Sequence, residues 1–262
     1  MLSFLAVTLE LPLKITEDLC TIALRAGAAI MTIAESPLQV DRKPDQSPIT
    51  AADQAANDVI VAALHRLTPT IPVVSEEGDK RLDEPDQPFW LVDPLDGTKE
   101  FIAGNGEFTV NIALIDKRVP VLGVVYAPAI ERLFFASGPG NAFQQRGADQ
   151  PIAINARTAS PDAVVALASR SHLDDRTQAY LAEHRVADIR QMGSSLKFCL
   201  IAAGEADLYP RFGPTMEWDT AAGHAVLAAA GGSVTTLDGG PFIYAKAGLR
   251  NPDFIARGAV AS

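Results

Sequence analysis

The chain has 262 residues, and its 32 acidic residues outnumber its 22 basic residues, which gives a net charge of −10 at pH 7. This charge disfavours a polyanionic partner such as duplex DNA, and a hydrophobic content of 48% indicates a globular protein with a sizeable core. The two cysteines, Cys20 and Cys199, form neither a disulfide framework nor a zinc-binding spacing, so a reducing cytoplasm is the expected compartment.

The apolar segment at residues 1–15 comes first along the chain. No lysine or arginine precedes Lys14, so the segment lacks the basic region of a secretory signal. It is also shorter than the ~20 apolar residues that span a bilayer. We expect an extra helix or strand packed on the body of the protein and no integral membrane segment. Peripheral association with a membrane has no visible support in the sequence and stays open.

Two helices are expected next. Apolar residues recur at steps of three and four from Ile15 to Ile33, and Thr16 is the expected N-cap of this helix. A second helix should begin at Thr50 and end near Leu67, after the proline-rich polar loop at residues 41–49.

Strands dominate the middle of the chain. The pattern predicts them at residues 71–76, 89–93, 108–116, 119–128, 132–137 and 142–146. Short turns separate most of them, so this sheet should be largely antiparallel.

Helices and strands alternate in the rest of the chain. Strands are predicted at 163–169, 187–192, 206–211 and 232–237, and helices at 195–204 and 218–230. This pattern indicates an α/β second half. We place the boundary at residue 150, with an α+β half at 1–150 and an α/β half at 151–262.

Two aspartates end the stretch WLVDPLDGT. Asp93 is held extended by the proline that follows it, and a bend at Gly97 would bring Asp93 and Asp96 side by side and leave the Leu95 carbonyl without a strand partner. Such a set of oxygen atoms suits a hard cation such as Mg²⁺. An ordinary Asp-Gly turn capped by Asp93 explains the same residues, and the stretch alone does not separate the two interpretations.

Acidic residues also lie at the ends of other apolar segments: Glu76 and Glu77, Glu217 and Asp219, and Asp53. A solvated turn would explain the first pair, a helix N-cap would explain Asp219, and a capping box with Thr50 would explain Asp53. Several such ends in one chain nevertheless favour a shared cation site.

Four stretches, DPLDGTKEF, SEEG, WDTAAGHA and DQSPITAAD, together resemble the signature motifs of the lithium-sensitive, Mg-dependent inositol monophosphatase superfamily. The stretches NGEFTVNIALI, GVVYAP, SRSH and GSSLKFCLIAAGEADLYPRFGPT are similar to its bacterial branch of 3′(2′),5′-bisphosphate nucleotidases, which act in sulfate assimilation. The resemblance covers about residues 15–255 and does not explain Glu217. It implies a layered αβαβα sugar-phosphatase fold with the site where the two halves meet.

The resemblance implies a site with two Mg²⁺ ions, and it leaves a third ion open. Glu76, Asp93 and the Leu95 carbonyl would hold one ion, while Asp93, Asp96 and Asp219 would hold the other. Two ions ~3.5–4 Å apart clamp the attacking and leaving oxygens of an in-line displacement.

The same resemblance implies the catalytic groups. Asp53 and Thr98, together with Glu76, would orient and deprotonate the attacking water. The N–H groups of Gly97 and Thr98 would receive the phosphate. Inhibition by lithium is a further expectation.

Substrate selection is expected in the second half. A predicted helix N-terminus carries Ser194, Ser195 and Lys197, where N–H groups and a lysine suit an anion. The other substrate contacts implied by the resemblance are Arg170, His172, Arg211 and Asp219. A solvated helix face for Lys197 and a bonded loop residue for His172 are the plainer interpretations.

The predicted activity is Mg-dependent removal of the 3′-phosphate from adenosine 3′,5′-bisphosphate, with a small phosphorylated nucleotide and no nucleic-acid polymer as partner. An inositol or sugar monophosphatase with the same metal site is the alternative, and Lys197 discriminates because a monophosphate needs no second anion pocket. A binding protein without turnover is disfavoured by Asp53, Glu76 and Thr98. The sequence leaves open monomer or homodimer, and adenosine 3′,5′-bisphosphate or 3′-phosphoadenylyl sulfate.

Overall fold

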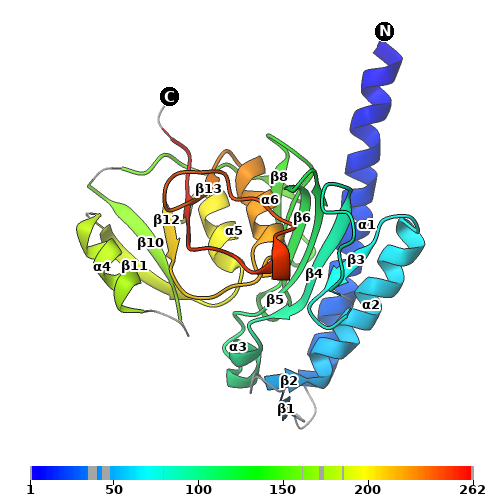
Figure 1. Cartoon of the computed structure of the whole chain (residues 1–262), viewed down its shortest axis with the longest axis horizontal. Coiled ribbons are helices and arrows are strands. Elements are labelled where there is room, and N and C mark those ends of the chain that lie inside the picture. Colours follow the sequence, from blue (N-terminus) through cyan, green and yellow to red (C-terminus); the bar gives the residue numbers. More distant parts are fainter. Residues whose placement is uncertain are drawn as a thin grey trace.

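A computed structural model of the full chain describes residues 2–34, 40–42, 48–78, 80–160, 162–170, 174–184 and 186–260, with the side chains of residues 14–34 and of those from 51 onward. Helices and sheets alternate in layers, in the order helices, larger sheet, helices, smaller sheet, helix (Figure 1). The αβαβα fold expected from the sequence is confirmed.

Five of the helices form three layers. The first pair covers the larger sheet, α5 and α6 lie between the two sheets, and α4 packs on the smaller sheet (Figure 1). The bounds are α1 Leu2–Ala34, α2 Ala51–Leu67, α3 Thr98–Ala103, α4 Asp175–Glu183, α5 Leu196–Ala202 and α6 Ala221–Ala229, with 3₁₀ turns η1 Pro128–Ile130 and η2 Ala247–Leu249. Within the described ranges, no helix has the length and hydropathy needed to cross a membrane.

The larger sheet has the strand order β3-β4-β5-β6-β7-β8-β9. Only the pair β3 and β4 is parallel, which confirms the largely antiparallel sheet expected here. Its strands are β3 Val73–Ser75, β4 Phe89–Asp96, β5 Thr109–Asp116, β6 Val119–Ala127, β7 Arg132–Ala136, β8 Ala142–Arg146 and β9 Ile152–Ala153. A separate antiparallel pair consists of β1 Val40–Arg42 and β2 Pro48–Thr50.

The smaller sheet is mixed, with the order β11-β10-β12-β14-β13. Strand β10 runs parallel to β11 and β12, whereas β14 runs antiparallel to β12 and β13. Its strands are β10 Val164–Ser169, β11 Val186–Met192, β12 Leu208–Arg211, β13 Ser233–Thr236 and β14 Phe254–Arg257. The elements that the sequence did not predict are the helix α4 and the strands β1, β2, β9 and β14. The strands β1 and β2 lie at the two ends of the segment that was predicted to be a loop.

The first helix differs from the expectation at its start. Thr16 is not an N-cap, because α1 begins at Leu2 and Thr16 is buried inside it. The residues before Thr16 include leucine and alanine, which are strong helix formers, so the helix continues through them. The apolar N-terminal segment is therefore part of α1 and not a separate element.

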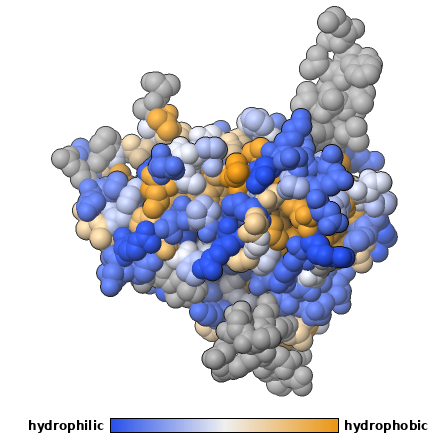
Figure 2. All heavy atoms as spheres, viewed as in Figure 1, coloured by the Kyte–Doolittle hydropathy of each residue, from blue (hydrophilic) through white to orange (hydrophobic). Residues whose placement is uncertain are grey.

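Two large apolar clusters hold most of the layers together, and a smaller third cluster joins α4 to the smaller sheet. One large cluster joins α1 and α2 to the larger sheet through side chains such as Leu19, Ile60 and Trp90. The other large cluster fills the space between the sheets, where Phe198 and Phe254 are buried. Burying one such side chain stabilises the fold by ~1.5–3 kcal/mol. Hydrophilic residues cover much of the face shown in Figure 2, and hydrophobic residues reach it in smaller patches.

A close contact places α6 directly on the larger sheet. A Cβ atom on Gly123 of β6 would lie 2.6 Å from both the Ala222 carbonyl oxygen and the Ala225 Cβ, so only glycine permits this approach. The start of α6, which carries Asp219 just before it, is thereby held over the larger sheet.

Candidate active site

A cavity of about 290 Å³ lies where the end of β4 meets α5, α6 and β12. Its acidic lining residues are Glu76, Asp93, Asp96, Glu100 and Asp219, and its basic lining residues are Lys99, Lys197 and Arg211. Five carboxylates against three cationic groups give the cavity an excess of negative charge, so an anionic substrate needs additional positive charge to enter.

Strand β4 brings Asp93 and Asp96 to the same side of the sheet by means of a β-bulge. The strand does not end at Asp93, as the sequence suggested, but continues to Asp96. Asp93 pairs with Asn111 and Asp96 pairs with Thr109, so three steps on β4 match two steps on β5. Side chains three positions apart point to opposite faces of a regular strand, and the extra residue of the bulge reverses this.

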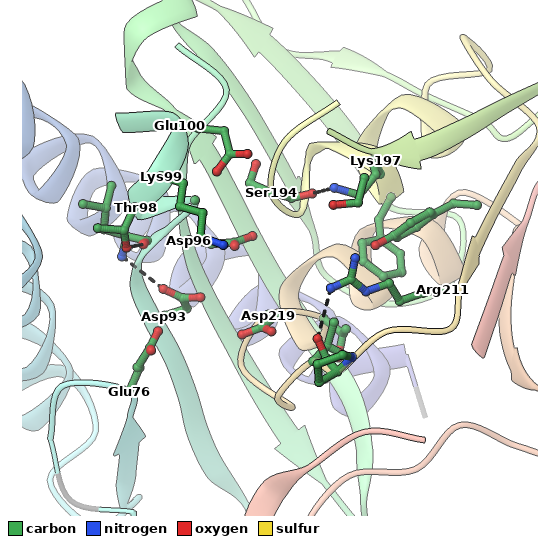
Figure 3. Close-up of a pocket in the computed structure, with 18 residues that line it drawn as sticks. Glu76, Asp93, Asp96, Thr98, Lys99, Glu100, Ser194, Lys197, Arg211 and Asp219 are labelled. Atoms are coloured by element: carbon green, nitrogen blue, oxygen red, sulfur yellow. Dashed lines mark hydrogen bonds between the residues drawn. The ribbon is translucent and has the colours of Figure 1, made fainter. Parts of the chain in front are cut away.

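The remaining acidic groups reach the same space from other elements. Glu76 follows β3, where its backbone N–H donates to the Val92 carbonyl at 3.1 Å. Asp219 precedes α6, and its Oδ2 accepts the N–H of Met216 at 2.9 Å. Figure 3 shows Glu76, Asp93 and Asp219 around a shared space, with the two basic side chains of α5 and β12 on its far side.

The electrostatics of these carboxylates fit a divalent cation. Burial, followed by the nearby Glu76 and Asp96 carboxylates, raises the pKa of Asp93 well above its usual value. Burial and then Asp96 raise the pKa of Asp219 in the same way, and burial raises the pKa of Asp96 to about 6. A cation would relieve both the burial penalty and the repulsion, and an all-oxygen donor set suits Mg²⁺.

The carboxylates line one cavity but do not form a closed coordination shell. Among the described residues, no three acidic, histidine or cysteine side chains stand close enough together to hold a metal ion in this conformation. The fit to Mg²⁺ therefore rests on the oxygen-only donors, their shared cavity and their mutual repulsion.

The predicted catalytic groups lie at the edge of this space. Asp53 is buried on α2, and its charge helps to raise the pKa of Asp93, although Asp53 is not among the described residues that line the cavity. Thr98 opens α3 and lines the cavity, and its hydroxyl donates to the Leu95 carbonyl at 3.4 Å. Gly97 lines the cavity at φ +89°, a conformation that favours glycine.

Two of the predicted cationic contacts, Lys197 and Arg211, line the opposite wall. Lys197 is only 3% exposed, so it does not lie on a solvated helix face. Its Nζ donates to the carbonyls of Met192 at 3.1 Å and Ser194 at 2.5 Å, and burial lowers its pKa to about 8. Arg211 is buried and donates from Nη2 to the Pro214 carbonyl at 3.0 Å.

Three other predicted substrate contacts are not found in the described lining of the cavity. Ser195 and Arg170 are not among the described residues that line the cavity, and His172 lies outside the described residues. The Ser195 N–H donates to Asp96 Oδ2 at 2.6 Å. The Arg170 guanidinium is bound in a fork by Glu107, at 2.8 and 2.6 Å.

Glu217, which the resemblance left unexplained, has a structural role. It is fully buried and accepts the backbone N–H groups of Ala245 at 2.7 Å and Lys246 at 2.8 Å. The Lys246 ammonium also pairs with it at 2.7 Å. The acidic residue beside Trp218 therefore holds the turn before η2.

Several cavity residues were missed by sequence reasoning. These are Lys99, Glu100, Ser169, Phe198, Tyr209, Pro214, Thr215 and Thr220. Lys99 and Glu100 stand directly after the DGT stretch, so their position beside the acidic motif was the available signal.

Comparison with known proteins decides the family. The model of the inositol monophosphatase family matches residues 12–258. The chain belongs to the inositol monophosphatase family. Within this family, the chain is 49% identical over 244 residues to the 3′(2′),5′-bisphosphate nucleotidase CysQ of Salmonella typhimurium, which covers 91% of this chain and 97% of that relative. The CysQ protein of Escherichia coli strain K12 gives the same identity and coverage.

Comparison with solved structures agrees with this family assignment. The crystal structure of CysQ from Bacteroides thetaiotaomicron superposes with a TM-score of 0.78 at 42% identity, covering 92% of this chain and 95% of that one. An inositol monophosphatase from Anabaena superposes with a TM-score of 0.75 at 26% identity, covering 94% and 91%. The resemblance stated from the sequence motifs is confirmed.

Proposed function

We propose that the protein is a Mg-dependent 3′(2′),5′-bisphosphate nucleotidase that converts adenosine 3′,5′-bisphosphate and water into AMP and phosphate. The observation that carries this proposal is one cavity that joins a cluster of carboxylates to two buried basic side chains, Lys197 and Arg211. The 49% identity to CysQ nucleotidases over 91% of the chain supports the same activity.

The carboxylate end is proposed to hold the metal and the phosphate that is removed. Glu76, Asp93 and the Leu95 carbonyl would hold one Mg²⁺, and Asp93, Asp96 and Asp219 a second. When bound, the ions supply the positive charge that offsets the carboxylates and the developing charge on the phosphate.

The chain's own groups would move the proton. Asp53 and Thr98, with Glu76, would orient a water in line with the ester bond, and the Asp53 carboxylate would take its proton as the water oxygen bonds to phosphorus. The bond from phosphorus to the 3′-oxygen would then break, and that oxygen would leave as the ribose hydroxyl by taking a proton from a solvent water, while Asp53 returns its proton to solvent. Gly97 and Thr98 would bind the phosphate oxygens through their N–H groups.

The basic end is proposed to hold the second phosphate. Lys197 and Arg211 line this wall, and within the described part of the chain neither is joined to a carboxylate in an ion pair. The buried Nε of Arg211 also has no hydrogen-bond partner there. Ser194 would contribute a polar contact, Asp219 would face the substrate from the metal side, and His172 stays a predicted contact.

The alternative is an inositol or sugar monophosphatase, which would use the same carboxylate end. A monophosphate would leave Lys197 and Arg211 without an anionic ligand, and a buried charge that no opposite charge offsets is unfavourable even when carbonyl groups accept its hydrogen bonds. The basic wall therefore favours the bisphosphate.

A substrate panel tests the proposal. Phosphate release is measured with Mg²⁺ for adenosine 3′,5′-bisphosphate, 3′-phosphoadenylyl sulfate, inositol 1-phosphate and fructose 1,6-bisphosphate. We expect the 3′-phosphorylated nucleotides to give the highest kcat/KM and millimolar-scale lithium to inhibit. A preference for inositol 1-phosphate would support the alternative instead.

We also place the enzyme in the cytoplasm. Both cysteines are free thiols, which suits a reducing compartment.

A further inference from the structure

The turn at residues 192–195 belongs to the substrate half but packs directly against the metal half. The Gly193 N–H donates to Glu107 Oε2 at 2.8 Å. A Cβ atom on Gly193 would lie 2.6 Å from the Glu100 Cγ and 2.8 Å from the Glu107 carbonyl oxygen, so the two halves meet here without spare room. Ser194 has φ +49°, which is uncommon for a residue other than glycine and marks a turn fixed by its contacts.

An ion pair outside the cavity holds this turn. Glu107 accepts two hydrogen bonds from the Arg170 guanidinium, from Nε at 2.8 Å and from Nη2 at 2.6 Å. The same Nη2 donates to the Gln191 carbonyl at 3.0 Å, and the Arg170 N–H donates to the Met192 carbonyl at 3.2 Å. Bidentate pairs of arginine and carboxylate are the strong and directional kind, so this clamp fixes the strand end that leads into the turn.

The turn at residues 192–195 orients the side chain of Asp96. The Ser195 N–H donates to Asp96 Oδ2 at 2.6 Å. The Ser195 hydroxyl is buried and donates to Asn111 Oδ1 at 2.6 Å, and it lies 2.9 Å from the Thr109 hydroxyl. Thr109 and Asn111 are the residues of β5 that pair with Asp96 and Asp93 across the β-bulge. The carboxylate of a candidate metal ligand is therefore set by a backbone N–H from the other half.

The same turn also sets the basic wall. The Lys197 ammonium is held by the carbonyls of Met192 and Ser194, at 3.1 and 2.5 Å. A displacement of the turn would therefore move Lys197 and the hydrogen bond to Asp96 together.

We propose that Glu107, Arg170 and the Ser195 N–H are positioning residues for the metal site, and that the clamp of Glu107 and Arg170 sets Mg²⁺ affinity through the turn at 192–195. This assignment replaces the direct substrate contact expected for Arg170 and Ser195. It rests on the proposed function for the Mg²⁺ site that includes Asp96, and Mg²⁺ binding is measured without any nucleotide.

The test uses Glu107→Gln, Arg170→Gln and the double variant. Arg170 is 42% exposed, so its substitution leaves the core intact. The matched control is Asp188→Asn, which removes one carboxylate from the exposed pair of Asp188 and Arg190 on the same strand β11. Mg²⁺ is titrated calorimetrically into the metal-free full chain, and thermal unfolding without metal checks the fold of each variant.

Each single variant should weaken Mg²⁺ binding by roughly tenfold, at the lower end of the 10–100-fold range typical of groups that orient metal ligands. The Mg²⁺ affinity of the double variant should lie within about twofold of that of the single variant that binds Mg²⁺ more weakly, because both residues act through one clamp. The control should stay within about twofold of the parent protein. Saturating Mg²⁺ should restore most of kcat in all variants.

Mg²⁺ affinity within twofold of the parent protein in both folded single variants would overturn the proposal. A raised KM for the nucleotide in Arg170→Gln alone, with unchanged Mg²⁺ affinity, would restore Arg170 as a direct contact and also overturn it. Failure of the nucleotidase assignment is a separate result, because it shows in the substrate panel and not in the metal titration.

Discussion

At the residue scale, Asp93 and Asp219 differ in how many ions would depend on them. Asp93→Asn should reduce activity below detection, since one carboxylate would serve both Mg²⁺ ions. Asp219→Asn should leave one ion in place and raise the Mg²⁺ requirement by roughly tenfold or more, because a charge-assisted contact contributes about 1.5–3 kcal/mol. Rates of phosphate release across a Mg²⁺ series check both. Full activity of Asp93→Asn at ordinary Mg²⁺ would contradict the assignment.

Lys197 should give the enzyme an alkaline limit. Its ammonium is charged below its pKa of about 8 and loses the charge as pH rises through that value, because burial disfavours the charged form. The value of kcat/KM for adenosine 3′,5′-bisphosphate should therefore fall above pH 8, until the loss matches that of Lys197→Ala, which we expect at roughly ten- to a hundredfold.

Two comparisons separate the effect of the Lys197 charge from other effects on activity. Lys197→Arg keeps its charge at these pH values, so the alkaline fall should be absent from its profile. A monophosphate substrate, if turned over, should show little effect of Lys197→Ala. Equal loss on both substrates would mean that Lys197 supports the metal end or the fold.

At the scale of elements, His224 of α6 should make the fold sensitive to acid. Its Nδ1 lies 3.0 Å from the Tyr244 hydroxyl, and burial, with a smaller effect of the Lys246 charge, lowers its pKa from 6.5 to about 4. Between these values the unfolded chain binds a proton that the folded chain does not. The stabilisation is therefore complete above pH 6.5 and is lost as pH falls toward 4, by up to about 3 kcal/mol.

Urea unfolding of the parent protein and of His224→Gln, measured from pH 7.5 to pH 4, tests this. The free-energy difference between the two proteins should shrink as pH falls. The raised pKa values of Asp93 and Asp219 act in the opposite direction, but they are common to both proteins and cancel in the comparison. A difference that is constant with pH would contradict the prediction.

The elements that the sequence predicted well are those with a local signal. The long apolar strands of the larger sheet and the helices α2, α5 and α6 are of this kind. By contrast, α4 buries only Thr177 and Leu181, which is too few for an apolar repeat, although its N-cap Asp174 accepts the Thr177 N–H at 2.7 Å and was a usable signal. Strand β14 has four residues, and its place depends on pairing with β12 and β13.

In the candidate site, too, the residues with a local sequence signal were predicted and those that depend on long-range contacts were not. Asp93, Asp96 and Asp219 stand in recognisable motifs, and the structure brings them to one cavity. The partner of Arg170 is Glu107, 63 positions earlier, and such a pairing has no mark in either local sequence. The bulge after Asp93 depends on the register with β5, which a single strand does not reveal.

At the scale of the whole molecule, the two sheets share one apolar cluster, which includes Phe89 of the larger sheet and Phe254 of the smaller one. We expect a single unfolding transition for this reason. On the proposed function, Mg²⁺ would bind the folded site alone, so it should raise the melting temperature, with about 2.7 kcal/mol of stabilisation at a hundredfold excess over its dissociation constant.

Differential scanning calorimetry with chelator and with Mg²⁺ measures both effects. Activity should disappear with the chelator and return with Mg²⁺. Two separate transitions would contradict the shared core, and turnover in excess chelator would contradict the metal-dependent mechanism.

The order of the cavity residues along the chain has a consequence for synthesis on the ribosome. The growing chain emerges from its N-terminus, so Glu76, Asp93 and Asp96 appear well before Lys197, and Asp219 appears last. A nascent chain would therefore carry most of its repelling carboxylates before Lys197 and Arg211, the basic groups of the opposite wall. We expect no hydrolysis of a phosphate ester until Asp219 and the helix α6 that follows it have been added, because α6 packs on the larger sheet beside the cavity. Any premature stop codon before that point should abolish the activity completely, rather than leave a weakened phosphatase.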